Sequence, residues 1–411
     1  MKFLHLADLH IGKRICEHSM LDDQAHILGQ VLEICSAEKP DAVLIAGDVY
    51  DKPVPSAEAV AVLDDFLVKL SAMGTKIFVV SGNHDSAERI AFGARLMQGT
   101  GVYMSPVYCG IFEPVTLQDV SGEVDVWMLP FVRPATVRAC LANDDERSQV
   151  TDYTSALRAA IAQIKFTEGR RNVLVAHQFV TGAETSDSEE NVGGLENVDA
   201  SVFEKFDYVA LGHIHKPQNV AKDNDGTVRA RYSGTPLKYS LSEAGHAKSV
   251  TVVELGSAGN VGDATAIAGD LFAGSGMRAA LQVREVPLVP LHDVREIRGT
   301  FAELVSEKFR NNQIAAGMSL EDYVYVKLTD ESDVPDAAQK LRGVYPNFMM
   351  LEYDNERTRN QKITVGVESV EKKSPMELFG EFFSEMTRRE MNEEESEFVQ
   401  SVINGIWEGE G

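Results

Sequence analysis

Short apolar runs alternate with amphipathic stretches over the first 255 residues of this 411-residue chain. The runs have the length of buried strands and end in polar or glycine-containing turns. They predict strands at Phe3–Leu6, Ala42–Ala46, Lys76–Val80, Val124–Leu129, Val173–Ala176, Tyr208–Leu211, Ala230–Ser233 and Ser249–Leu255. The stretch Ala57–Leu70 has helical periodicity instead, with Val60, Leu63, Phe66, Leu67 and Leu70 on one face. This alternation predicts a layered α/β fold, a β-sandwich flanked by helices.

The pattern changes after residue 255. Residues 256 to 276 are rich in Gly, Ala and Asp and are typical of a connection. A smaller βαβαβ unit is predicted next, with strands at Leu281–Pro287, Asp322–Thr329 and Phe348–Tyr353. Its first helix is predicted from the capping box Thr300-x-x-Glu303 to Phe309, and its second helix over Asp333–Arg342. We therefore expect a large domain over residues 1–275, a small α/β domain over 276–355, and a linker with helices over 356–411.

Two amphipathic helices are predicted near the C-terminus, over Met376–Met386 and Glu397–Trp407. Their apolar faces are formed by Leu378, Phe379, Phe382, Phe383 and Met386, and by Phe398, Val399, Val402, Ile403, Ile406 and Trp407. Short helices of this kind need a surface against which such faces are buried. Either the main domain or a partner protein can provide it, and the terminal position and the charge between the helices favour a partner.

Composition sets limits on the function. A hydrophobic content of 44% and a charged content of 25% are typical of a soluble globular protein. The N-terminus is no signal peptide, no run of 18 apolar residues occurs, and the four cysteines form no C-x-x-C pair, so we expect a cytoplasmic protein. The net charge of −24 weighs against a protein that holds nucleic acid alone. Part of the excess lies in the C-terminal tail, and bound cations would cancel another part.

Chemistry-bearing residues follow five of the predicted strands, where α/β sheets place their sites. They are Asp8-x-His10, Gly47-Asp48-x-x-Asp51, Gly82-Asn83-His84-Asp85, His177, and Gly212-His213-x-His215. Each segment alone is explained as a turn or as surface histidines, but their conjunction favours a metal site. Residues two apart on extended backbone point to the same side, so Asp8 and His10 can reach one ion. The carboxylate, imidazole and amide set lacks thiolate and suits manganese, iron or zinc.

The number of candidate ligands indicates how many ions are bound. Seven ligands are too many for one tetrahedral ion and fit two ions that share a bridging carboxylate. The seven are Asp8, His10, Asp48, Asn83, His177, His213 and His215.

In this order, the five segments resemble the calcineurin-like metallophosphoesterases, whose pattern is D-x-H, GDxxD, GNH[D/E], a lone His and GHxH. The resemblance implies two divalent ions, with manganese favoured, that activate a water and hold the phosphate. It implies that Asp8, His10, Asp48 and His215 hold the first ion, and that Asp48, Asn83, His177 and His213 hold the second. His84 would be catalytic rather than a ligand, because it stabilises the phosphate and protonates the leaving oxygen. Asp51 would hydrogen-bond His84 and orient it.

Further segments narrow the resemblance within the family. Ala46–Asp51, Tyr208–His215 and Arg231–Pro236 are similar to nuclease subunits of the family, and Ile297–Thr300 is similar to their capping domain. Asp51 departs from the archaeal and eukaryotic nucleases, which tend to carry His there, and it favours the bacterial branch. The resemblance implies exonuclease and endonuclease action on double-strand DNA ends and hairpins, in complex with an SbcC-type coiled-coil ATPase.

The same resemblance implies two protein contacts. A homodimer is expected, with Ala57–Leu70 and Arg89–Met97 as candidate interface helices that can equally belong to the core. The ATPase is expected to contact Leu378, Phe379, Phe382, Phe383, Val399, Val402, Ile403, Ile406 and Trp407.

Two other functions compete with a DNA nuclease. The acidic charge favours a small-molecule or cyclic-nucleotide phosphodiesterase, but the capping domain and the amphipathic tail count against it. A DNA-end tethering scaffold with an idle site is the other alternative, and the intact ligands of all five segments count against that.

Overall fold

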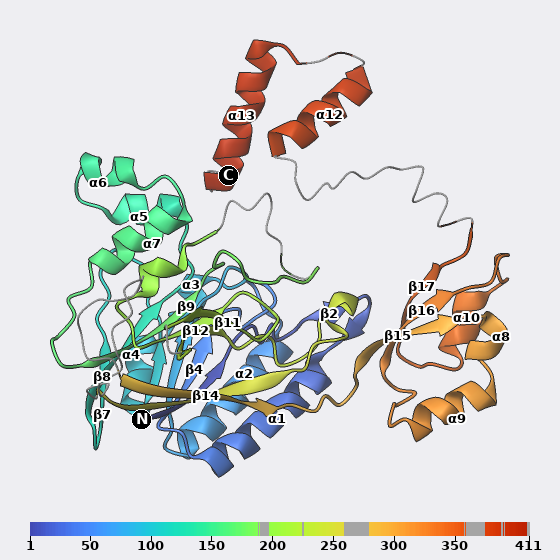
Figure 1. The fold of residues 1–411 in the computed structure, drawn as a ribbon, viewed down its shortest axis with the longest axis horizontal. Coiled ribbons are helices and arrows are strands. Elements are labelled where there is room, and N and C mark those ends of the chain that lie inside the picture. The colour runs from blue at the N-terminus through green and yellow to red at the C-terminus, as the bar shows by residue number, and fades with distance from the viewer. Residues whose placement is uncertain are drawn as a thin grey trace.

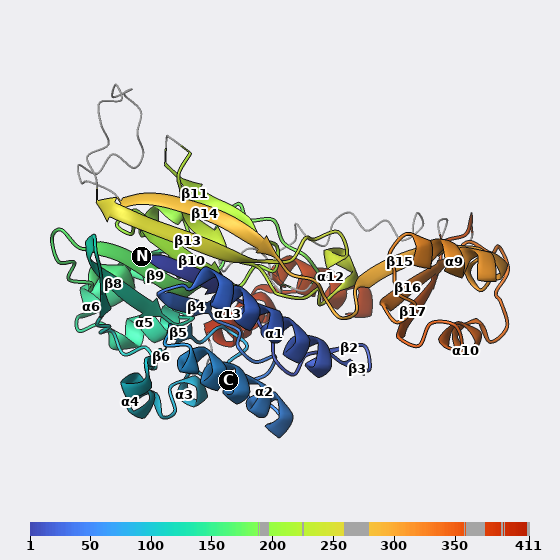
Figure 2. The same ribbon diagram turned by 90° about the horizontal axis from the view of Figure 1, so that it is seen from below.

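Two six-stranded sheets face each other in the larger part of the molecule (Figures 1 and 2). The computed structural model describes residues 1–187, 189, 197–223, 226–258, 279–356, 358, 375–387, 389 and 391–408. The first sheet has the order β14-β13-β1-β4-β5-β6, with bounds Ala279–Pro287, Ser249–Ala258, Lys2–Leu6, Ala42–Ala46, Lys76–Val80 and Val102–Met104. The second has the order β11-β12-β10-β9-β8-β7, with bounds Gln218–Lys222, Val228–Tyr232, Tyr208–Gly212, Arg171–His177, Gly122–Leu129 and Val115–Asp119.

The inner faces of the sheets form the central core. Phe3 and Phe78 from the first sheet and Val126, Val175 and Tyr208 from the second are buried in one cluster. Strands buried on both faces read as continuous apolar runs, which is why the sequence predicts them well. The predicted strands are all present, and the layered α/β class is confirmed.

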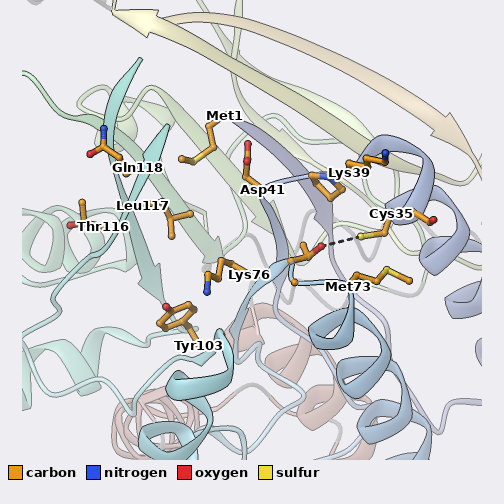
Figure 3. A pocket seen from close by; sticks show the side chains of 14 residues that line it. Met1, Cys35, Lys39, Asp41, Met73, Lys76, Tyr103, Thr116, Leu117 and Gln118 are labelled. Carbon is orange, nitrogen blue, oxygen red and sulfur yellow. Dashed lines mark hydrogen bonds between the residues drawn. The ribbon is translucent and has the colours of Figure 1, made fainter. Parts of the chain in front are cut away.

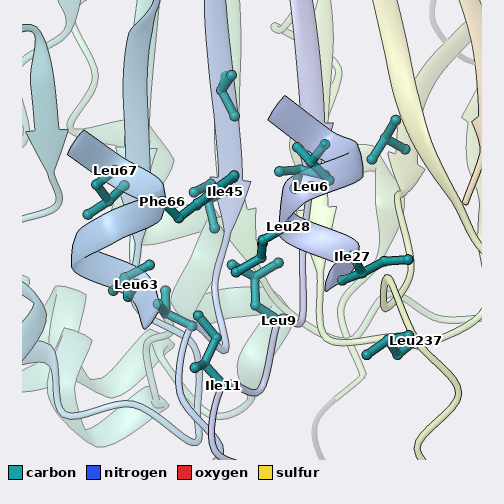
Figure 4. Packing of buried hydrophobic residues seen from close by; sticks show 14 of the residues in the cluster. Leu6, Leu9, Ile11, Ile27, Leu28, Ile45, Leu63, Phe66, Leu67 and Leu237 are labelled. Atoms are coloured by element: carbon teal, nitrogen blue, oxygen red, sulfur yellow. The ribbon is translucent and has the colours of Figure 1, made fainter. Parts of the chain in front are cut away.

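Helices cover the outer face of each sheet. On the first sheet lie α1 (Leu21–Glu38) and α2 (Ala57–Ala72), whose residues Leu28, Leu63 and Phe66 are buried in one cluster with Ile45 (Figure 4). On the second lie α5 (Pro134–Cys140) and α7 (Tyr153–Ala162), with α6 (Asp144–Gln149) beside them. Val60, which the sequence analysis placed with the buried face of α2, is 44% exposed. The buried face of α2 uses Ala59 instead.

Short elements connect these layers. They are the hairpin β2 (Arg14–Ile15) and β3 (His18–Ser19), the helices α3 (Ala87–Ile90) and α4 (Ala94–Met97), and the 3₁₀ turns η1 (Gln98–Thr100), η3 (Ala200–Phe203) and η4 (Leu241–Glu243).

One strand belongs to a different sheet from the one expected. The segment Leu281–Pro287 was predicted to open the small domain, but it lies in β14, which pairs along β13 in the first sheet. The small domain has a parallel sheet of its own, β15-β16-β17, with bounds Val294–Gly299, Tyr323–Leu328 and Phe348–Tyr353. Its first strand, β15, was not predicted. Periodicity identifies a strand but carries no information about its pairing partner, which explains the error.

The helices α8 (Phe301–Leu304), α9 (Glu307–Ala315) and α10 (Ala337–Arg342) belong to the small domain. The helix expected from Thr300 to Phe309 is broken after α8, because Ser306 caps a new helix by accepting from the amide of Phe309. The domain is fixed to α1 through Asp23. The Asp23 carboxylate is buried and accepts from the Tyr323 hydroxyl at 2.8 Å and from His292 Nδ1 at 3.1 Å.

The two predicted C-terminal helices are present as α12 (Pro375–Thr387) and α13 (Glu393–Glu408). They contact each other and stand apart from both sheets (Figure 1). Phe382 and Phe398 are 58% and 69% exposed, and Phe379, Met386 and Val402 are exposed as well. The side chains of Leu378, Ile406 and Trp407 lie outside the described residues. Within the described part of the chain, no helix has both the length and the hydropathy needed to cross a membrane.

Candidate metal centre

The carboxyl ends of β1, β4, β5, β9 and β10 converge on one place between the two sheets. Four residues there have backbone φ angles in the left-handed region: Asp8 (53°), His10 (44°), Asp48 (47°) and His213 (109°). Such angles are unfavourable for residues other than glycine and tend to occur at functional sites. Hydrogen bonds from the amides of Asp8 and His10 to the carbonyls of Gly47 and Asp48 hold these turns in place.

A first group of donor atoms is formed by His10, His215 and Asp48. His10 Nε2 lies 3.2 Å from His215 Nε2 and 3.6 Å from Asp48 Oδ2. All three residues are buried. Donor atoms about 2.1 Å from one ion stand roughly 3.0 to 3.4 Å apart, so this spacing fits a metal ion at their centre.

A second group contains His177, His213, Asn83 and, again, Asp48. Asn83 Oδ1 lies 2.9 Å from His177 Nε2 and 3.0 Å from His213 Nδ1. The two imidazole nitrogens are 3.3 Å apart, and Asp48 Oδ2 is 3.4 Å from His177 Nε2. Asp48 Oδ2 therefore lies within 3.6 Å of both groups, as a bridging ligand must.

Asp8 lies beside the second group. Its Oδ1 accepts from the His213 amide at 2.9 Å, while its Oδ2 is buried and has no hydrogen-bond partner. A buried carboxylate oxygen without a partner is costly unless a cation satisfies it. The ligand atoms of Asp8, Asp48 and His177 all lie within 4.8 Å of one another. The side chains thus fit two divalent ions, and the placement of Asp8 on the first ion remains a prediction.

Glycines make the close approach possible. A Cβ at Gly82 would collide with the Asp48 carboxylate, and a Cβ at Gly47 would collide with the His177 ring. Gly47 also has a φ of 86°, which favours glycine. The glycines of both motifs are therefore needed for the packing around Asp48 and His177.

Burial and mutual charge set the protonation of the group. Burial raises the pKa of Asp8 to about 7 and lowers the pKa of His213 to about 3. Burial opposes the protonation of His177 too, but the charges of Asp48 and Asp8 and the hydrogen bonds to Asp48 and the Ala46 carbonyl together outweigh it and raise the His177 pKa to about 9. Positive charge is thus stabilised beside Asp48, where a cation would be held.

His84 stands at the open side of the centre, and its side chain is 39% exposed. Its Nε2 is 4.0 Å from Asp48 Oδ2, and its amide donates to Asp48 Oδ1 at 2.9 Å. His10, Asp48 and His84 also form a group of possible ligands, so distances alone do not separate a ligand role from a catalytic one. Its exposure suits a residue that meets a substrate.

Asp51 contacts His84 through a different atom from the one expected. The contact joins the main-chain carbonyl oxygen of Asp51 to His84 Nδ1 at 3.2 Å. The Asp51 carboxylate accepts instead from Lys13 Nζ at 2.8 Å and lies 3.8 Å from His10 Nδ1. An orienting contact to His84 is thus present, but it does not use the side chain.

Two carboxylates around the centre were not assigned a role from sequence. Asp85 accepts from the amides of Val49, Tyr50 and Gly82 at 2.9 to 3.0 Å, which joins the loops after β4 and β5. Glu243 accepts from His215 Nδ1 at 3.0 Å. Asp85 stands in the predicted GNHD segment, whereas Glu243 is far from any motif and only the fold reveals it.

A hollow of about 680 Å³ lies at the opposite ends of the strands, lined by Lys39, Asp41, Lys76 and Tyr103 among others (Figure 3). Lys39 and Asp41 precede β4, and Lys76 opens β5. Among the described residues, both groups of possible metal ligands lie at the carboxyl ends instead. The chemistry of the molecule is therefore located at the converging strand ends.

Comparisons with known proteins agree with this geometry. The family model of the calcineurin-like phosphoesterases matches residues 1–217, and the chain belongs to this family. A model described as the type 5 capsule protein repressor C-terminal domain matches residues 290–387. The SbcD component of the nuclease SbcCD from Staphylococcus epidermidis is 28% identical over 419 residues, covering 100% of both chains. One solved structure aligns with 69% of this chain and 98% of its own at 13% identity and a TM-score of 0.35, too low to support an argument.

Proposed function

We propose that the chain is the nuclease subunit of a DNA-processing complex and hydrolyses phosphodiester bonds at double-strand DNA ends and hairpins with two divalent metal ions. The observation that carries the proposal is the pair of donor groups that share Asp48. A relative named as a nuclease component matches the chain over its whole length, which supports DNA as the substrate.

We assign the ligands as follows. Asp8, His10, Asp48 and His215 hold the first ion, and Asp48, Asn83, His177 and His213 hold the second, with manganese as the preferred metal. Bound ions of this kind lower the pKa of a water and neutralise charge on the phosphate. The protein holds the ligand atoms at fixed distances and keeps the centre buried on every side except that of Asn83 and His84.

His84 is the proposed catalytic residue that is not a ligand. Its exposed ring can reach a phosphate that enters from the open side, stabilise its charge and give a proton to the leaving oxygen. The Asp51 carbonyl accepts from Nδ1–H, so Nε2 is the atom directed toward the substrate.

The proposed partner is an SbcC-type coiled-coil ATPase. A chain with a net charge of −24 needs a basic partner to hold DNA at physiological salt. The exposed apolar residues of α12 and α13 provide a docking face, for which we name Phe379, Phe382, Phe383, Val399, Val402 and Ile403, together with Leu378, Ile406 and Trp407 outside the described side chains. Deletion of residues 370 to 411 should abolish binding of the partner, and survival of that binding would refute the assignment.

A homodimer is proposed at the helices after β5. Phe92 and Leu96 are 83% and 86% exposed. Val60 and Val68 of α2 are exposed as well. Large apolar side chains with this exposure are typical of an interface. The sedimentation coefficient of Phe92→Glu should fall to that of a monomer, while an unchanged dimer would exclude these residues.

The experiment that tests the function compares two substrates. Hydrolysis of a DNA hairpin and of bis-p-nitrophenyl phosphate is measured with manganese, with and without the ATPase partner and ATP. A DNA nuclease subunit should cleave the hairpin in a partner-stimulated reaction. Cleavage of the small ester alone would favour the small-molecule phosphodiesterase, and DNA binding without cleavage of either would favour the tethering scaffold.

A further inference from the structure

A buried pair of charged residues lies behind the metal ligand His215. Glu243 ends the turn η4, and Lys248 directly precedes β13, so both come from the segment between β12 and β13. Glu243 is fully buried, and Lys248 is 7% exposed. Lys248 Nζ lies 2.6 Å from Glu243 Oε2. Neither residue is near the predicted metal motifs in sequence.

Glu243 fixes the tautomer of His215. Its Oε1 lies 3.0 Å from His215 Nδ1, and an ionised carboxylate only accepts hydrogen bonds. His215 Nδ1 therefore carries the proton, and Nε2 carries the lone pair. His215 Nε2 is the atom that lies 3.2 Å from His10 Nε2, in the first donor group.

Lys248 holds both the carboxylate and the backbone of the ligand. Besides Glu243 Oε2, its ammonium donates to the His215 carbonyl oxygen at 3.0 Å and to Thr235 Oγ1 at 2.6 Å. Three N–H groups thus meet three acceptors, and the buried charge is satisfied. One lysine therefore locates the main chain of His215 and the group that orients its ring.

The other ligand histidines lack such support. His177 Nδ1 donates to the neutral Ala46 carbonyl at 2.9 Å, and His10 Nδ1 and His213 Nε2 are buried without a hydrogen-bond partner. Among the four, all of them described, only His215 has a hydrogen-bonded carboxylate from outside the ligand set. A buried ion pair is weak evidence for stability, because apolar residues of similar volume often serve as well. A role in the metal centre explains the charges better.

We infer that Glu243, held by Lys248, is a positioning residue for the first metal ion. Because Glu243 orients His215, this ion is bound more tightly than the ligands alone would allow. A carboxylate on the far nitrogen orients the ring and makes the near nitrogen more basic, and loss of such a partner lowers metal affinity roughly 10- to 100-fold. The inference rests on the proposed two-metal function and adds an asymmetry between its two sites.

The test measures manganese binding by calorimetry on the full-length protein, so it does not depend on nuclease activity. Glu243→Ala should lower the affinity for one of the two manganese ions by about 10- to 100-fold and leave the affinity for the other within about threefold of the wild type. Glu243→Gln should recover part of the loss, because its amide oxygen accepts from Nδ1. Lys248→Met should lower the affinity for the same ion. The matched control is Glu254→Gln, which removes a carboxylate from the more exposed Lys2 pair and should bind both ions normally.

Thermal unfolding separates positioning from folding. Glu243→Gln should unfold within a few degrees of the wild type and still show the selective loss. Wild-type affinity for both ions in Glu243→Ala, or an equal loss of both ions in Glu243→Gln, would overturn the inference. If the Glu243 variants show the selective loss of one ion but the wild-type protein cleaves no DNA, the proposed function fails while the role of Glu243 stands.

Discussion

The metal centre and the C-terminal helices are built in opposite ways. In the centre, polar side chains are buried, the backbone is held in unfavourable angles, and Gly47 and Gly82 allow no larger residue. In α12 and α13, apolar side chains such as Phe382 and Phe398 are exposed. The centre is complete within one chain, whereas the helices leave an apolar face uncovered. This difference indicates that the candidate site is preorganised within this chain. Under the proposed function, we expect the delivery of DNA to depend on a partner that covers the apolar face of the helices.

The largest effect should come from the centre. His84→Ala removes the residue proposed to meet the phosphate. Hairpin cleavage should fall by about 10²- to 10³-fold, because the proposed stabilising and proton-donating group is lost. Cleavage rates at saturating manganese give the measurement. Binding of two manganese ions should be unchanged, because the role proposed for His84 is catalytic and not that of a ligand. Loss of one ion in this variant would instead make His84 a ligand, and near wild-type cleavage would remove it from the mechanism.

A smaller effect is expected at the tail. Val402→Asp places a charge in the exposed apolar face of α13, and affinity for the ATPase partner should fall by about 30-fold, as for a residue at the centre of an interface. Ser401→Asp adds the same charge at an exposed polar position and serves as control. Manganese-dependent hydrolysis of bis-p-nitrophenyl phosphate should remain unchanged in both. Equal affinity of both variants for the partner would show that this face is not used.

The smallest effect is expected at Asp51, beside the metal centre. Asp51→Asn keeps the carbonyl that contacts His84 and removes the carboxylate that pairs with Lys13 and lies 3.8 Å from His10 Nδ1. Such a pair contributes about 0 to 1 kcal/mol, so the cleavage rate should change by less than about fivefold. A loss of about 100-fold in the cleavage rate would show that the Asp51 side chain orients His84, as the sequence suggested.

Much of the centre could be predicted from the sequence because each ligand follows a buried strand. Parallel strands of one sheet bring their carboxyl ends to one edge, so Asp8 and Asp48 were expected together. His213 follows a strand of the second sheet, and it reaches the same place because the two sheets face each other. The roles of Glu243 and Lys248 could not be predicted, because their segment has no motif and meets His215 only in the fold. The atom by which Asp51 contacts His84 depends on a local turn that no periodicity encodes.

The fold could be predicted from the sequence to a similar extent as the metal centre. Strands buried on both faces, such as β4 and β9, give continuous apolar runs, whereas β15 has a mixed burial pattern and was missed. The strands β13 and β14 are far apart in the sequence, and a pattern of apolar residues along the chain does not record that they pair. The left-handed angles of Asp8, His10 and Asp48 are likewise invisible in the sequence, since they are imposed by packing.

The proposed mechanism depends on two metal ions that share Asp48. Crystals of the full-length protein soaked in manganese, with data collected at the manganese absorption edge, test it directly by anomalous difference density. The account predicts two peaks, one among His10, His215 and Asp48 and the other among Asp48, Asn83, His177 and His213. A single peak at saturating manganese, or two peaks of which only one contacts Asp48, would contradict it.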